Sequence, residues 1–185
     1  GKRAENAAAA ALLDEHWNRA FPDPQILGRY PPQLAEALEP YIEAGDMARI
    51  RRPVDWFGLN HYGPIFAKTD PNFVWGYGWG EAPAGSPDYG VGWPIFPDAF
   101  GDEILTIHQT YRLPIVVTEN GCGGGDEIGP DGGVDDPHRV AYFKLYQQAM
   151  RDAVAAGADV RGYFVWSLLD NFEWGSGYNT RFGLV

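Results

Sequence analysis

The chain has 185 residues, of which 45% are hydrophobic and 15% aromatic, so we expect a folded domain with a core and not a disordered segment. Its 14 basic and 25 acidic residues give a net charge of −11, which repels phosphate backbones and makes nucleic acid an unsuitable partner. Cys122 is the sole cysteine, which excludes an internal disulfide and a multi-cysteine zinc site.

We expect the first residues to form a helix and not a targeting signal. Lys2 and Arg3 precede a run of alanines, but Glu5 and Asp14 interrupt the stretch, so we predict a helix and not a signal peptide. No uncharged apolar run approaches the roughly 20 residues that a membrane span needs. With one thiol in the chain, we expect a cytoplasmic protein.

Helices and strands are expected to alternate along the chain. Apolar spacing and turn residues predict a helix over 7–20, short helices over 31–53 and a strand over 55–60. Residues 63–97 are rich in Gly, Pro and aromatic side chains without a sustained period, so we predict an ordered loop over a site.

The second half continues this alternation. We predict a helix over 100–111, a strand over 114–118 and a turn-rich connection over 123–133. A helix should begin with Asp136 as N-cap and Pro137 in the first position and end at Gly157, and a strand should follow over 162–167.

This alternation is typical of parallel α/β folds. Three strands cannot close a barrel, and the chain stops on the apolar run 182–185, where a further helix is expected. The chain also begins with Gly1 and not with Met. We therefore expect that it is a piece of a longer protein.

Glu119 is the first candidate for chemistry. It ends the apolar run of the segment PIVVTENG, over residues 114–121. The carboxyl ends of parallel strands face the ligand crevice, so a carboxylate there is placed for catalysis. A solvated turn residue before Asn120 and Gly121 is the alternative.

The C-terminal segment repeats the pattern, with Trp166 at a strand end and Glu173 and Trp174 just beyond it. Aromatic faces pack against sugar rings, and a carboxylate can accept hydrogen bonds from neighbouring hydroxyls. The three residues indicate a sugar pocket. The alternative is that both tryptophans are core residues, although Glu173 would then need buried partners.

Several segments closely resemble the signature of glycoside hydrolase family 1, the β-glucosidase and β-galactosidase family. They are VTENG around Glu119, FGLNHY at 57–62 and GYFVWSLLDNFEWGSGYNTRFGLV at 162–185, with FPDPQILGRYPP at 21–32 and VGWPIFPDAF at 91–100 in the same order. The resemblance implies an α/β fold, the TIM (β/α)8 barrel. Residues 1–185 would be the C-terminal part of one catalytic domain, covering about strands 6 to 8, without its N-terminal half.

The resemblance also implies a retaining mechanism. Glu119 matches the catalytic nucleophile, whose partner acid should lie about 5–5.5 Å away, and Tyr62 matches the tyrosine that stabilises it. Glu173 and Trp174 match residues that bind the hydroxyls of the nonreducing sugar, and Trp166 matches the platform beneath it.

The same resemblance assigns the remaining pocket residues. Asn60 and Phe182 match wall positions, and Trp93 resembles an aromatic residue at the entrance, where the leaving group lies. His61 stands where the family often has a second aromatic residue, which is a mild departure.

One essential motif of the family is missing from this sequence. The family's acid/base lies in an Asn-Glu-Pro motif, which does not occur here. Glu81, Asp126 and Glu127 lie in loop segments, and we expect them to be surface charges and not substitutes for it. The N-terminal half would have to be a separate chain, a cleaved segment or absent.

We therefore expect a retaining β-glycosidase, foremost a β-glucosidase acting on terminal non-reducing β-D-glycosyl residues of a glycoside or short oligosaccharide, with no cofactor and no metal. This chain alone should be inactive. A non-catalytic carbohydrate-binding protein or truncated relic is the alternative, whereas no G-x-G-x-x-G supports a nucleotide site. Residues 174–178 lack a Ser-Lys-x-Tyr phosphate grip, which favours a neutral sugar; glucose, galactose and fucose remain open.

Overall fold

The computed structural model describes residues 2–88, 92–124 and 126–185, which form two compact units. The first unit comprises the chain up to residue 54 together with 65–82. The second comprises 55–64 and 83–185 and contains every candidate site residue named above. Each unit is described by itself.

The first unit is built on the predicted N-terminal helix. Helix α1 spans Lys2–Asp14 and continues as a π-helical turn, η1, over Glu15–Arg19. Ala9 and Leu13 on this helix form a small buried cluster with Tyr77, which comes from the stretch expected to be an ordered loop.

That stretch contains secondary structure, so the prediction that 63–97 lacks it was wrong. Strand β2, Ala67–Thr69, pairs antiparallel with β3, Tyr77–Trp79. Both strands are short, and each is stabilised by pairing with the other and by packing on α1. These contacts come from distant residues, so they produce no periodic pattern in the local sequence. The remainder, 83–97, belongs to the second unit, and its residues 89–91 lie outside the described chain.

Short helices complete the first unit. The short helices predicted over 31–53 are α2 at Pro32–Leu38, η3 at Glu39–Tyr41 and α3 at Asp46–Ile50, whereas η2 at Asp23–Leu27 was not predicted. The buried carboxylate of Glu15 caps α2 by accepting hydrogen bonds from the N–H groups of Gln33 and Leu34.

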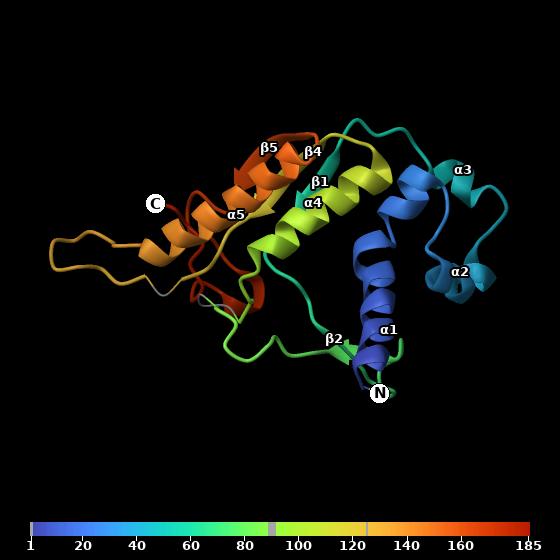
Figure 1. The fold of residues 1–185 in the computed structure, drawn as a ribbon, viewed down its shortest axis with the longest axis horizontal. Coiled ribbons are helices and arrows are strands. Elements are labelled where there is room, and N and C mark those ends of the chain that lie inside the picture. Colours follow the sequence, from blue (N-terminus) through green and yellow to red (C-terminus); the bar gives the residue numbers. More distant parts are fainter. Residues whose placement is uncertain (1, 89–91, 125) are drawn as a thin grey trace. The chain divides into compact units, whose positions relative to one another are not determined.

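The second unit is a parallel α/β unit (Figure 1). Its sheet has the order β1-β4-β5, with β1 at Phe57–Asn60, β4 at Ile115–Asn120 and β5 at Val160–Val165, all parallel. Helix α4, Pro97–Tyr111, lies between β1 and β4 in the chain, and α5, Pro137–Ala155, lies between β4 and β5. The alternation predicted from the sequence is confirmed.

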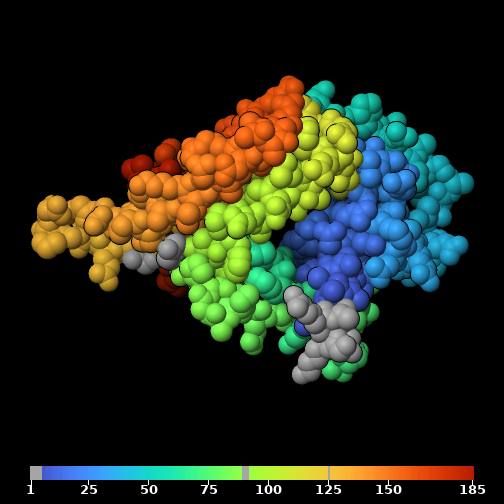
Figure 2. Space-filling model, in the orientation of Figure 1, coloured from blue at the N-terminus to red at the C-terminus, as the bar shows by residue number. Residues whose placement is uncertain are grey.

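Both helices cover the same side of the unit, where they lie against each other (Figure 2). Phe100 and Ile104 on α4, Tyr146 on α5 and Ile115 and Val117 on β4 are all buried. Burying apolar side chains from three elements in one layer anchors β4 at the centre of the sheet.

Helix α5 begins as the sequence predicts. The Asp136 carboxylate accepts a hydrogen bond from the Arg139 N–H at 3.3 Å, and Pro137 is the first helical residue. The helix ends just before Gly157, whose φ of 109° is accessible to glycine and strained for other residues.

The connection from β4 to α5 is turn-rich, as predicted, although Gly125 lies outside the described residues. Ile128 forms an isolated bridge with Val134, and the Gly129 N–H donates to the Gly133 carbonyl at 2.7 Å. A last short 3-10 helix, η4, spans Trp174–Ser176. Among the described helices, none combines the length and apolarity needed to cross a membrane.

Candidate active site

The candidate residues gather at the carboxyl ends of the three parallel strands. Asn60 at the end of β1 is paired with Glu119 on β4, and Asn120 is paired with Val165 at the end of β5. Trp166 follows at once, and its N–H donates to the Asn120 carbonyl at 3.0 Å. Ligands bind at this edge of parallel sheets.

Glu119 is hydrogen-bonded to Tyr62. The Tyr62 hydroxyl donates to Oε2 of Glu119 at 2.7 Å. Burial, this hydrogen bond and the negative charges of Glu119 and Glu173 all raise the pKa of Tyr62 far above its usual value. The phenol therefore stays protonated and remains a donor to the carboxylate.

Glu173 is held in the same way by Trp166. The indole Nε1 donates to Oε1 of Glu173 at 3.0 Å, and the Glu173 N–H donates to the Gly177 carbonyl at 2.7 Å, which folds the loop back on itself. The carboxylate still has lone pairs for a ligand. Because the charge of Glu173 acts on Tyr62, the two acid–aromatic pairs belong to one electrostatic environment.

Three aromatic rings, including that of Tyr62, pack against one another near Glu119. The centroid of the Tyr62 ring lies 5.1 Å from that of Trp93 and 6.0 Å from that of Phe182, and Trp93 and Phe182 are 6.2 Å apart. Trp93 is half exposed, whereas Phe182 is buried. Phe182 therefore supports the other two rings and does not itself present a face to solvent.

Trp174 and Asn60 are both exposed. Trp174 is 84% exposed and lies in the left-handed region with φ 45°. The Thr118 hydroxyl donates to Oδ1 of Asn60 at 2.6 Å, so the amide NH2 is directed to other acceptors. Thr118 was not among the candidates, and the only local signal is its place next to Glu119.

A buried polar group beneath the strand ends was also missed. Asn120, Tyr142 and Tyr146 are buried and hydrogen-bonded to the backbone of residues 61–62. The spacing of Tyr142 and Tyr146 shows only that they share one face of α5. Their hydroxyls bond to the carbonyl of Tyr62, which follows β1 and lies 80 or more positions earlier in the sequence.

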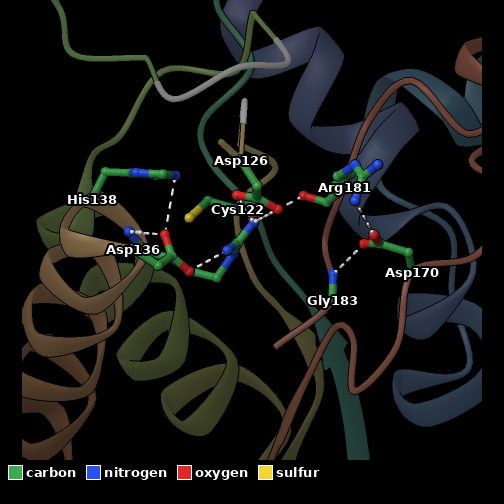
Figure 3. A network of polar contacts seen from close by, with 8 residues as sticks. Cys122, Asp126, Asp136, His138, Asp170, Arg181 and Gly183 are labelled. Atoms are coloured by element: carbon green, nitrogen blue, oxygen red, sulfur yellow. Dashed lines mark hydrogen bonds and ion pairs between the residues drawn. The ribbon is translucent and has the colours of Figure 1, made fainter. Parts of the chain in front are cut away.

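Arg139 joins the two loops that flank the site, and Figure 3 labels its partners Cys122, Asp126, Asp136 and Arg181. Its buried guanidinium pairs with Asp136 and with Asp126, the latter at 3.1 Å, and donates to the carbonyls of Cys122 and Arg181 at 3.4 and 3.1 Å. Asp170 binds the same C-terminal segment by accepting from the Gly183 N–H at 2.9 Å. Phe182 lies between these two anchor points.

One carboxylate–histidine group in the described residues has a spacing suited to a metal ion, namely Asp126, Asp136 and His138. The Arg139 guanidinium already neutralises both carboxylates, so an added cation would meet its positive charge. Burial raises the pKa of Cys122 to about 12, against a lowering by Arg139, so this thiol stays protonated. We infer no metal centre here.

Three loop carboxylates were considered above as substitutes for the missing acid. In the structure they are surface groups or form structural ion pairs. Asp126 is committed to Arg139, and Glu127 is exposed in the same connection. Glu81 is exposed in the first unit. None of the three is bonded to Glu119 or Tyr62.

Comparisons with known proteins match the whole chain. The sequence profile of Glycosyl hydrolase family 1 covers residues 1–185. Beta-glucosidase A of Acetivibrio thermocellus is 36% identical over all of this chain and 43% of its own length. A bifunctional beta-D-glucosidase/beta-D-fucosidase of Bifidobacterium breve is 38% identical over 97% of this chain and 44% of its own length.

A solved structure shows the same fold. The beta-glucosidase from Thermotoga maritima in complex with deoxynojirimycin superposes with a TM-score of 0.91 at 32% identity, covering all of this chain and 42% of that one. The chain thus spans less than half the length of the relatives it matches. The resemblance in the sequence is confirmed: the chain is part of a (β/α)8 barrel and belongs to glycosyl hydrolase family 1.

Proposed function

We propose that this chain is the C-terminal part of a retaining β-glycosidase, foremost a β-glucosidase, that releases terminal non-reducing β-D-glycosyl residues. The observation that carries the proposal is the 2.7 Å hydrogen bond from Tyr62 to Glu119 at the carboxyl end of the sheet. The family and the beta-glucosidase names of its relatives support the same activity.

The chemistry follows from an ionised Glu119. Its carboxylate attacks the anomeric carbon, the bond to the leaving oxygen breaks, and a second carboxylic acid supplies the proton that this oxygen needs. The resulting glycosyl ester is hydrolysed when the second group, now a base, deprotonates a water molecule. Tyr62 donates to the carboxylate in the free enzyme and orients it for attack.

Sugar binding is assigned to the second acid–aromatic pair. Glu173, already oriented by Trp166, accepts hydrogen bonds from sugar hydroxyls, and the Trp166 ring packs against the sugar face. Asn60 and Trp174 add polar and aromatic contacts. Trp93, half exposed and packed against Tyr62, borders the place of the leaving group.

The second carboxylic acid must come from elsewhere in the barrel, because the chain has no Asn-Glu-Pro motif. Two features support an N-terminal barrel portion as partner. Strands β1 and β5 are the edges of the described sheet, whereas a closed barrel pairs both. Phe164 on β5 and Leu168 just after the strand are 62% and 67% exposed, which is unusual for large apolar side chains.

A neutral sugar fits the binding loop best. Residues 173–178 contain no lysine or arginine, so the loop offers no cation to a 6-phosphate. Glu173 would instead repel it.

Reconstitution tests the proposal. We define the completed barrel as this chain joined to an N-terminal barrel portion, either the sequence encoded before residue 1 or the corresponding part of the Thermotoga maritima enzyme. The chain alone should hydrolyse an aryl β-glucoside barely or not at all, and the completed barrel should do so with retention, followed by NMR of the anomeric proton. Comparable turnover by the purified chain alone, or an inverted product, would refute it.

A further inference from the structure

Tyr62 is held by two tyrosines that do not touch the substrate site. The hydroxyls of Tyr142 and Tyr146, both on α5, donate to the backbone carbonyl of Tyr62 at 3.3 and 3.1 Å. Their rings are stacked with centroids 4.1 Å apart, and both side chains are almost fully buried. One carbonyl therefore accepts two hydrogen bonds from one helix.

Asn120 extends this arrangement to all three strands. Its Nδ2 donates to the His61 carbonyl at 2.7 Å and to the Tyr142 hydroxyl at 2.9 Å, and its Oδ1 accepts from the Tyr163 hydroxyl at 2.6 Å. The donors run in one direction, from Tyr163 on β5 through Asn120 on β4 to Tyr142 and on to Tyr62. Every hydroxyl hydrogen in this hydrogen-bond network has an acceptor.

A backbone hydrogen bond connects this network to Glu119. The His61 N–H donates to the Glu119 carbonyl at 3.0 Å. The main chain of residues 61 and 62 is thus held at three points: the Glu119 carbonyl bonds to the His61 N–H, Asn120 bonds to the His61 carbonyl, and Tyr142 and Tyr146 bond to the Tyr62 carbonyl. A shift of this segment would carry the Tyr62 ring away from the carboxylate.

On the basis of the proposed function, we infer that Tyr142 and Tyr146 are positioning residues, whose hydroxyls hold the Tyr62 backbone so that its phenol stays on Glu119. Phenylalanine at both positions would fill the same volume, so packing alone does not require the hydroxyls. Burying them is costly unless they are bonded, and each is bonded to the residue that contacts the nucleophile.

A double-mutant cycle in the completed barrel tests the inference. Tyr146→Phe and Tyr142→Phe remove one oxygen each and should lower kcat/KM for an aryl β-glucoside about fivefold to twentyfold, mostly through kcat, since misplacement by about 1 Å can cost about a hundredfold. In the Tyr62→Phe background, each should lower it less than twofold further, because the group they position is gone.

The two variants check each other. Tyr146 also accepts from the Phe96 N–H at 3.2 Å, so its loss disturbs the segment next to Trp93, whereas Tyr142→Phe leaves that bond in place. If Tyr146→Phe does not fold, Tyr142→Phe alone decides. Tyr111→Phe is the matched control, because Tyr111 is a buried tyrosine on α4 stacked on Phe57 at the opposite end of β1, and it should keep wild-type kinetics.

The outcomes separate this inference from the proposed function. If the wild-type completed barrel turns over but the tyrosine variants keep full kcat/KM, or lose the same factor with and without Tyr62, the positioning role is wrong and the proposed function stands. If the wild-type protein has no glycosidase activity, the proposed function fails and the inference fails with it. Loss in the wild-type background that vanishes in the Tyr62→Phe background supports both.

Discussion

Tyr62 and Glu119 are 57 residues apart in the chain, yet the phenol oxygen lies 2.7 Å from Oε2 of the carboxylate. The contact exists because β1 and β4 are parallel neighbours: Glu119 is one of the last two residues of β4, and Tyr62 comes two residues after the end of β1. Tyr62 also packs against Trp93 and Phe182, so its ring has little freedom to turn away. The nucleophile proposed here is thus oriented by a rigid donor.

Removing this donor should slow the reaction. We expect Tyr62→Phe in the completed barrel to lower kcat/KM about 10- to 100-fold, since a hydrogen bond to a charged group contributes about 1.5–3 kcal/mol. Steady-state hydrolysis of an aryl β-glucoside measures it. Tyr41→Phe, at an exposed tyrosine of the first unit, should keep wild-type values. An unchanged Tyr62→Phe enzyme would contradict the role of this contact.

The Trp166–Glu173 pair should govern sugar affinity. Glu173→Gln keeps an acceptor for the indole but removes the charge, so kcat/KM and affinity for deoxynojirimycin should both fall about 10- to 100-fold. Trp166→Phe keeps an aromatic face, although a smaller one, and loses the donor but not the Glu173 charge, so we expect a smaller loss, about fivefold. Trp56→Phe, just before β1, is the control. Inhibition constants that stay at wild-type values would show that this pair does not bind the sugar.

Arg139 should be important for stability. Its guanidinium side chain is 4% exposed and pairs with two carboxylates, so Arg139→Met leaves both without their cation and should lower the free energy of unfolding by about 3 kcal/mol or more. Denaturant unfolding measures this. Arg161→Met removes a far more exposed pair with Asp159 and should have little effect. Equal effects of the two substitutions would contradict the importance of the network.

His61 should make stability depend on pH. Burial lowers the pKa of His61 to about 4 from the usual 6.5, so below pH 6.5 the unfolded chain binds the proton first. The stability contributed by the neutral His61 side chain is therefore fully present above pH 6.5 and is lost as the pH falls toward 4. Its ring packs against Phe100 and Tyr146, so His61→Phe suits the site.

The expected result is a difference that grows in acid. Between pH 7 and about pH 4.5, the free energy of unfolding of the wild-type protein should fall by about 2–3 kcal/mol more than that of His61→Phe. Denaturant unfolding at both pH values measures it. Parallel pH dependence of the two proteins would show that His61 does not titrate in this way.

Local sequence signals predicted the second unit well. Asp136 and Pro137 predict the start of α5 because capping depends on neighbours in the chain, and the apolar run before Glu119 predicts β4 because a buried parallel strand has that composition. The placement of Glu119 at the strand end followed from the same reasoning. Each of these features depends on residues that are close together in the sequence.

Features that depend on distant partners could not be predicted in this way. The β2–β3 hairpin was missed because its strands are three residues long and are stabilised by packing on α1. The roles of Tyr142 and Tyr146 could not be predicted, since nothing near them in the sequence shows that their hydroxyls reach Tyr62. Phe182 was predicted at a wall position of the pocket, and its burial and its ring contacts with Tyr62 and Trp93 could not be predicted because they come from distant segments.

Covalent trapping tests the central claim most directly. The completed barrel should be incubated with a 2-deoxy-2-fluoro-β-glucoside that has a good leaving group, digested, and analysed by tandem mass spectrometry. The account predicts a fluoroglucosyl mass increase on the peptide that contains Glu119, absent from Glu119→Gln. A label on another residue, or glycosidase turnover that persists in Glu119→Gln, would contradict it.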